Sequence, residues 1–174
     1  MSLGEEDNKA ALRALAHPVR LQIMSLLTSA PLTAAEVARE LDLTHANASY
    51  HLRTLHAGGM IVLAGEEKIR GGVAKRYRYE PAEDRGVPAT PEGNRVIFVA
   101  AANELIRRTA EGKFDGPKVM ADAEVWVDPS DWKRIKEAIG ELAIELHLAA
   151  KPPRTPGTVR TSTTVAMFDM EAGR

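Results

Sequence analysis

Residues 44–60 (THANASYHLRTLHAGGM) decide the fold, because they combine an apolar helical face with an unusual polar one. Ala48, Leu52 and Leu55 recur at helical spacing, which is typical of a face that packs against a core. The opposite face carries hydrogen-bonding side chains, at Asn47, Tyr50, Arg53 and Thr54. Such side chains suit base edges and phosphates better than the Glu and Lys mixture of an ordinary solvated face. The pattern predicts a helix that packs on one side and contacts a partner on the other.

The same segment contains signals for both ends of this helix. The hydroxyl of Thr44 can accept a backbone N–H that the first turn leaves unpaired. Gly58 and Gly59 can end the helix, since glycine enters the left-handed conformation at little cost. We therefore predict a helix over residues 44–57.

Three shorter helices are predicted upstream. Residues 5–16 form a moderately amphipathic segment, and Pro18 begins a second segment whose apolar residues predict a buried helix. Thr33 and Glu36 then form a capping-box pattern for a helix over residues 34–41. Two short helices joined by about three residues make a helix-turn-helix, whose second helix enters the major groove of DNA.

A basic hairpin is predicted downstream of the central helix. Residues 60–63 are apolar, and the alternation of residues 76–79 predicts a second strand after a Gly-Gly turn. Residues 68–78 contain five basic residues and no acidic one. A basic hairpin after a DNA-contacting helix is the wing of a winged helix, which touches the flanking backbone or minor groove. We therefore predict a wing over residues 64–78.

Together these segments resemble the winged-helix domain of the ArsR-type bacterial transcription regulators. Residues 11–27 (ALRALAHPVRLQIMSLL) are similar to their first helices, and residues 32–61 are similar to their helix-turn-helix. The family's Ser-x-His-Leu-x-x-Leu core falls at Ser49, His51, Leu52 and Leu55, and GGVAKRYRY is similar to the wing. The resemblance implies a homodimer that binds an operator, often a repressor released by an effector. The chain departs from the founding members because the third helix lacks metal-sensing thiolates and a long segment follows the wing.

The sequence changes character after residues 81–94 (PAEDRGVPATPEGN), which we expect to be a linker. It would separate a DNA-binding domain at residues 5–80 from a dimerisation and possible effector-binding α+β region at residues 95–174. Residues 95–111 predict a helix that is apolar almost all round at its start, so it needs cover on more than one side. Its small residues allow a second helix to approach closely. We therefore expect it to be part of a homodimer interface.

The rest of the C-terminal region predicts a small α+β appendage. Residues 123–127 (AEVWV) predict a strand, and Asp128 with Pro129 predicts the start of a helix. Between residues 130 and 150, apolar positions recur at spacings typical of a packing seam. Residues 158–170, rich in Thr and Val, predict a final strand. The expected fold class is mainly α with small β: a winged helix-turn-helix DNA-binding domain, a helical dimerisation region and a small α+β appendage.

The predicted DNA-binding residues lie on the central helix and the wing. For the polar face of that helix, the alternative is an ordinary solvated surface. For His45, contact with DNA and simple exposure to solvent are equally expected. Ser49 and Thr54 lie at the margins of the polar face, where each could contact either a phosphate or a base. His51 belongs to the apolar face and is expected to be a hydrogen-bonded core histidine. The predicted DNA-binding residues are Thr44, His45, Asn47, Ser49, Tyr50, Arg53, Thr54, Lys68, Arg70, Lys75 and Arg76.

The composition restricts where nucleic acid can bind and where the protein works. The formal net charge is −1, so a nucleic-acid surface must be local to the basic part of the first half. The absence of cysteine excludes disulfides and thiolate chemistry, in agreement with a reducing cytoplasm. No long apolar run or secretion signal is present. We expect a cytoplasmic protein with double-stranded DNA and a second copy of itself as partners, and no membrane contact.

Metal, cofactor and catalytic sites are not predicted. The five histidines include no pair three or four residues apart on a predicted helix. Glu137, Glu141 and Glu145 form a carboxylate stripe, but such a stripe beside lysines is usually solvated. No phosphate-binding glycine loop, nucleophile elbow or paired-acid context is present, so we do not expect an enzyme. A metal site to which both chains of a dimer contribute ligands remains an alternative.

Two further alternatives concern the C-terminal region. Its aromatic and sulfur-containing side chains could line a pocket for a small-molecule effector, or could simply form the core of the appendage. These residues are Trp126, Trp132, Met167 and Phe168. The alternative function is a protein-interaction module on a winged-helix scaffold, without sequence-specific DNA binding.

Overall fold

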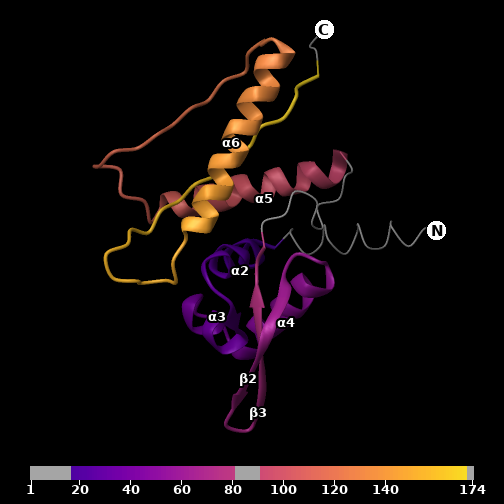
Figure 1. Ribbon diagram of the computed structural model, residues 1–174, viewed down its shortest axis with the longest axis vertical. Coiled ribbons are helices and arrows are strands. Elements are labelled where there is room, and N and C mark those ends of the chain that lie inside the picture. The colour runs from indigo at the N-terminus through magenta and orange to yellow at the C-terminus, as the bar shows by residue number, and fades with distance from the viewer. Residues whose placement is uncertain (1–16, 81–90, 172–174) are drawn as a thin grey trace, which may run out of the picture.

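The computed structural model describes residues 17–80 and 91–171, where it has five helices and a three-stranded antiparallel sheet. In Figure 1 the hairpin lies at one end, α6 at the other, and α5 crosses between them. The expected class, mainly α with small β and a helix-turn-helix domain first, is confirmed. In chain order the elements are α2 (Pro18–Ser29), β1 (Leu32–Thr33), α3 (Ala34–Glu40), α4 (His45–Ala57), β2 (Val62–Ile69), β3 (Gly72–Arg78), α5 (Pro91–Thr109) and α6 (Pro129–Ala149).

The predicted starts of α3 and α4 and the predicted stop of α4 are confirmed, whereas α3 ends at Glu40, one residue before the predicted end. The Thr33 hydroxyl accepts the backbone N–H of Glu36 at 3.3 Å, and the Glu36 carboxylate accepts the backbone N–H of Thr33 at 2.7 Å. The Thr44 hydroxyl accepts the backbone N–H of Asn47 at 3.2 Å. At the other end of α4, Gly59 takes the left-handed conformation with φ +70°. These local bonds fix where both helices of the helix-turn-helix begin, at about 1 kcal/mol for each cap.

The core of the first domain lies between α2, α3, α4 and the start of β2. Ala48, Leu52 and Leu55 of α4 are fully buried, as the helical spacing predicted. They belong to one cluster with Ile23, Leu27, Leu32, Val37, Ala38, Met60, Ile61 and Tyr77. The burial of one face of α4 determines which face remains for a partner.

The sheet has the order β1-β3-β2, so β3 is its central strand. In the hairpin Ile69 pairs with Gly72, which leaves Arg70 and Gly71 as the loop, and Gly71 has φ +100°. Strand β1 was not predicted, because two residues carry no periodicity. It forms because Leu32 pairs with the buried Tyr77 of β3, which ties the wing to the start of α3.

Helix α5 packs across α2 through a buried carboxylate. Glu104 is only 3% exposed and accepts a hydrogen bond from Gln22 of α2 at 3.4 Å. It also accepts bonds from Arg107 at 2.7 Å and Arg108 at 3.1 Å. Helix α5 begins at Pro91, so the last four residues of the predicted linker are helical instead. Proline is favoured in a first helical turn, which accounts for the earlier start.

Helix α6 begins as predicted, with Asp128 as N-cap and Pro129 in the first turn. Only its C-terminal end approaches the first domain. There the His147 ring lies 6.2 Å from that of Tyr79, and Arg154, just beyond the helix, pairs with Glu40 at 2.7 Å. No α6 residue is buried, and Figure 1 shows its N-terminal half projecting beyond α5.

The two strands predicted for the C-terminal region, residues 123–127 and 158–170, are wrong for the single chain. Both segments are extended but belong to no ladder, because neither has another described strand beside it. The appendage of the described chain is therefore a helix with two extended segments rather than an α+β unit. The predicted helix over residues 5–16 and most of the predicted linker lie outside the described residues.

Candidate nucleic-acid interface

The solvent-facing side of α4 presents the polar residues that the sequence singled out. Asn47, Tyr50 and Arg53 are exposed, and Tyr50 is 54% exposed despite its aromatic ring. The Arg53 guanidinium has no hydrogen bond or ion pair to another described residue. Helix α4 contains no acidic residue, so nothing on it opposes an approaching phosphate.

Four further predicted residues flank this face. Thr44 and His45 are exposed at the helix start, where backbone N–H groups and the helix dipole favour an anion. Ser49 and Thr54 are half-buried at the margins. The Thr54 hydroxyl donates to the carbonyl of Tyr50 at 2.9 Å but can still accept a bond from a partner.

A buried histidine fixes the orientation of α4. The His51 ring, 4% exposed, accepts a hydrogen bond at Nδ1 from Nε of Arg20 at 3.3 Å. Burial lowers the pKa of His51, and the positive charges of His17 and Arg20 lower it further. An unprotonated Nδ1 is required to accept this bond. The expectation of a hydrogen-bonded core histidine is thus confirmed.

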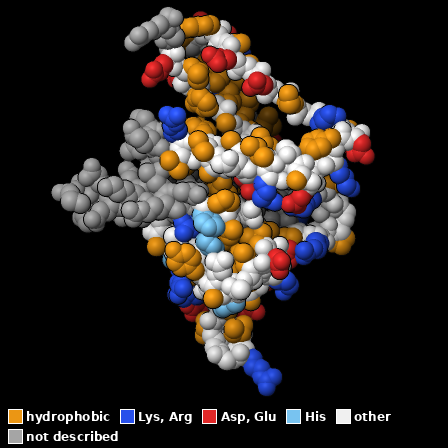
Figure 2. Space-filling model, turned by 180° about the vertical axis from the view of Figure 1, so that it is seen from behind, with side chains coloured by type: hydrophobic (Ala, Val, Ile, Leu, Met, Phe, Trp, Pro, Cys, Tyr) orange, Lys and Arg blue, Asp and Glu red, His pale blue; other side chains and the backbone are white. Residues whose placement is uncertain are grey.

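The wing presents cations beyond α4. Lys68, Arg70 and Lys75 are exposed, and their side chains form no ion pair with another described residue. Figure 2 shows Lys and Arg side chains at the extreme tip of the molecule, where Figure 1 places the hairpin loop. The ring of His56 on α4 lies 5.7 Å from that of Tyr77 on β3, so helix and wing are held together.

Arg76 differs from the other predicted wing residues because it is engaged within the molecule. It donates to the carbonyl of Pro31 at 2.8 Å and forms ion pairs with Glu36 at 3.3 Å and with Glu67. The pKa of Glu36 is raised by burial but lowered more by its bonds from Thr33 and Arg76. Sequence reasoning missed this cluster, because β1, α3 and the wing meet there only in three dimensions.

Comparison with known proteins supports a helix-turn-helix domain in this part of the chain. Residues 15–64 match the family described as a helix-turn-helix domain, a span that includes α2, α3 and α4 and reaches the start of β2. Among curated proteins, no match was found. The fold and the matched domain define the class: this chain contains a helix-turn-helix domain of the DNA-binding kind found in transcription regulators. The presence of such a domain supports double-stranded DNA as a binding partner.

The described residues include neither a metal-binding cluster nor a membrane-spanning helix. They contain no cluster of three or more His, Asp or Glu side chains that could hold a metal ion. Within the same ranges, no helix has the length and apolar character needed to cross a membrane.

Proposed function

We propose that the protein is an ArsR-type transcription regulator that binds a pseudo-palindromic operator as a homodimer and acts as a repressor. Helix α4 would lie in the major groove, and the wing, residues 64–78, would contact the flanking backbone. The observation that carries the proposal is the exposed face of α4, where Asn47, Tyr50 and Arg53 stand together on a helix without acidic residues.

The predicted residues take different roles in this complex. Arg53 is suited to bind a guanine with two hydrogen bonds, and Asn47 and Tyr50 are suited to contact bases beside it. Lys68, Arg70 and Lys75 supply attraction to phosphates that does not depend on sequence. Thr44, His45, Ser49 and Thr54 lie where phosphates flank the groove contact, and Arg76 holds the wing in position.

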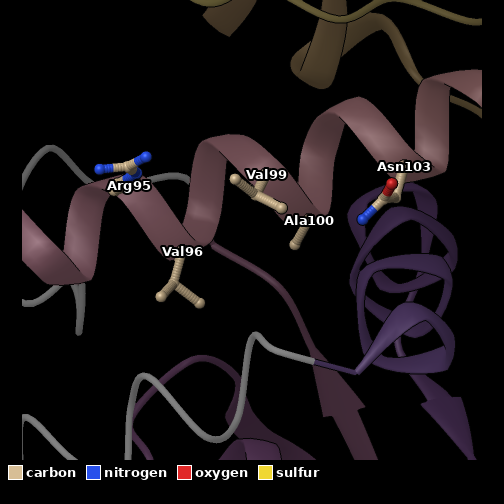
Figure 3. A pocket seen from close by; sticks show the side chains of 5 residues that line it. All are labelled: Arg95, Val96, Val99, Ala100 and Asn103. Carbon is tan, nitrogen blue, oxygen red and sulfur yellow. The ribbon is translucent and has the colours of Figure 1, made fainter.

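A homodimer is supported by the surface of α5. Figure 3 shows a shallow pocket of about 280 Å³ lined by Arg95, Val96, Val99, Ala100 and Asn103, with Val96 and Ala100 pointing to one side of the helix. Val99 is exposed on α5, and so is Ile106 further along the helix. An apolar helix left uncovered in one chain favours a partner helix. We therefore propose residues 5–80 as the DNA-binding domain and residues 95–174 as the dimerisation region.

We propose that a small-molecule effector would bind in a shallow groove between α5, α6 and residues 165–167. It measures about 320 Å³, is mostly apolar, and contains one cation, Lys136. Of the four side chains named for the effector alternative, Met167 lines it, whereas Trp126, Trp132 and Phe168 do not. The other lining residues are Phe98, Ile139, Gly140, Ala143 and Val165. Trp126 lies elsewhere and is almost fully exposed. An apolar effector with an anionic group would fit this lining.

The direct test is selection of bound fragments from the source genome, in the presence of excess random competitor DNA. We expect one short motif with two-fold symmetry, its half-sites about one helical turn apart, and binding that weakens steeply as salt rises. Fragments without a common motif would contradict operator binding. They would favour the alternative, a protein-interaction module on the same scaffold.

A further inference from the structure

The segment between α5 and α6, residues 113–127, stands away from the rest of its own chain; we call it the arm. Val119 is 99% exposed, Met120 91% and Trp126 88%. No backbone-to-backbone hydrogen bond joins the arm to another described residue. Its one hydrogen bond to a main-chain carbonyl, from Lys118 to Phe114, lies within the arm itself. Large apolar side chains are unfavourable in water, and an extended main chain without a neighbour is available to pair with another strand.

The last described segment, residues 158–171, is also extended; we call it the tail. Side chains hold it against α5 and α6: the Phe98 and Phe168 rings are 5.0 Å apart, and Trp132 donates to Asp169. Its main chain, however, forms no ladder with any described segment. The tail is therefore an extended segment held in place without a ladder, and it is rich in the Thr and Val residues that favour strands.

The arm and the tail form no ladder with each other within one chain. Figure 1 shows the arm drawn out from the end of α5 along one side of α6 to its far end, whereas the tail crosses behind α6 to its other side. Each has the composition of a strand, and each lacks the neighbour that a strand requires. Each copy of the chain thus has two extended segments of strand-favouring composition whose main chains form no ladder.

We infer that two copies of this chain pair reciprocally, with residues 119–127 of the arm of one copy forming a β-ladder with residues 158–170 of the tail of the other. The inference rests on the homodimer of the proposed function and specifies how that homodimer is built. The two-fold axis that relates two operator-binding helices also relates the two ladders.

Two observations favour a second copy over a foreign protein as the occupant. First, reciprocal pairing satisfies the arm and the tail of both copies in one closed assembly, whereas a foreign strand would leave one of them unpaired. Second, exposed apolar side chains also stand on α6, at Leu142 and Leu148, and on α5, at Val99 and Ile106. One partner that covers the arm would therefore extend the interface already proposed for α5.

The chain has no cysteine, so introduced cysteines report this pairing without background. One variant carries Val125→Cys in the arm, and the others carry Thr161→Cys, Thr163→Cys or Val165→Cys in the tail. The arm variant is mixed with each tail variant, oxidised and separated on a non-reducing gel. We expect a covalent dimer containing one copy of each variant in at least one mixture. Residues directly opposite each other in a β-ladder are close enough to form a disulfide. Glu66→Cys on the wing, mixed with the same tail variants, is the control and should give none.

Three results would overturn the inference. The first is no mixed covalent dimer in any of the three mixtures. The second is an intramolecular disulfide in a chain that carries both substitutions. The third is a monomer in sedimentation equilibrium at all concentrations tested. Fragment selection with the unmodified protein is independent of this test, so operator binding without cross-linking would refute only the arm–tail pairing. Cross-linking without operator binding would refute only the proposed function.

Discussion

At the scale of single residues, the burial of His51 beside two positive charges makes the stability of the first domain depend on pH. Burial, with the charges of His17 and Arg20, lowers the pKa of His51 below its ordinary value of 6.5. The unfolded state then binds more protons as the pH falls below that value. The contribution of His51 is therefore complete above pH 6.5 and is lost as the pH falls towards the lower pKa of the folded protein.

We accordingly expect urea unfolding at pH 5.5 to give a smaller free energy of unfolding than at pH 7.5. In His51→Gln, which removes the titrating group, the difference between the two pH values should shrink. The exposed His45→Gln variant should keep the difference of the unmodified protein. An unchanged pH dependence in His51→Gln would contradict this assignment.

A second residue, Glu104, connects the helix-turn-helix to the C-terminal region. Burial raises the pKa of its carboxyl, but the hydrogen bonds from Arg107 and Arg108 outweigh burial and lower it. Glu104→Gln removes the charge that these guanidinium groups share, and we expect a loss of about 1–3 kcal/mol in the free energy of unfolding. The matched control is Glu137→Gln on exposed α6, which should change stability by less than about 0.5 kcal/mol. Equal effects in denaturant titrations would contradict a structural role for Glu104.

At the scale of elements, replacing two glycines by alanine should have opposite effects on the stability of the protein. Gly59 ends α4 with φ +70°, whereas Gly140 is inside α6 with nothing within 4 Å of the position that a Cβ would take. Gly59→Ala should therefore destabilise the protein by about 1 kcal/mol, because a side chain strains the left-handed conformation. Gly140→Ala should stabilise it by up to about 1 kcal/mol, because alanine is the better helix former. Thermal unfolding of both variants checks the contrast, and the same sign for both would refute it.

The elements of the first domain could be predicted because their signals are local. The buried face of α4, the caps Thr33 and Thr44, and the hairpin each depend on residues a few positions apart. Strand β1 and the ion pairs of Arg76 could not be predicted, since they depend on segments that meet only after folding. The structure gives the positions of the predicted DNA-binding side chains, whereas their contacts with DNA remain a prediction.

The strands predicted in the C-terminal region failed for a different reason. The composition of residues 123–127 and 158–170 favours strands, but a strand exists only when another strand lies beside it. Within one chain, the arm follows one side of α6 while the tail crosses behind it, and the two form no ladder. The arm–tail pairing that we propose would make both predictions correct for two chains, although they are wrong for one.

At the scale of the whole molecule, one polar network joins the DNA-binding domain to the tail. Gln22 of α2 bonds to Glu104 of α5, which binds Arg107. Arg107 pairs with Glu111 at 2.6 Å, and Glu111 pairs with Arg160 of the tail at 2.8 Å. The helix-turn-helix and the proposed dimer surface are thus connected through α5. In a dimer, this connection would determine the spacing of the two α4 helices.

The central claim is that the exposed face of α4 distinguishes one DNA sequence from another while the wing does not. It is tested most directly by measuring the affinities of Arg53→Ala and Lys75→Ala for the selected operator and for a random duplex, at one salt concentration. We expect Arg53→Ala to lose about 1–3 kcal/mol on the operator and much less on the random duplex. Lys75→Ala should weaken binding to both duplexes by the same factor. If Arg53→Ala instead lost the same affinity on both duplexes, α4 would not be the element that recognises the sequence.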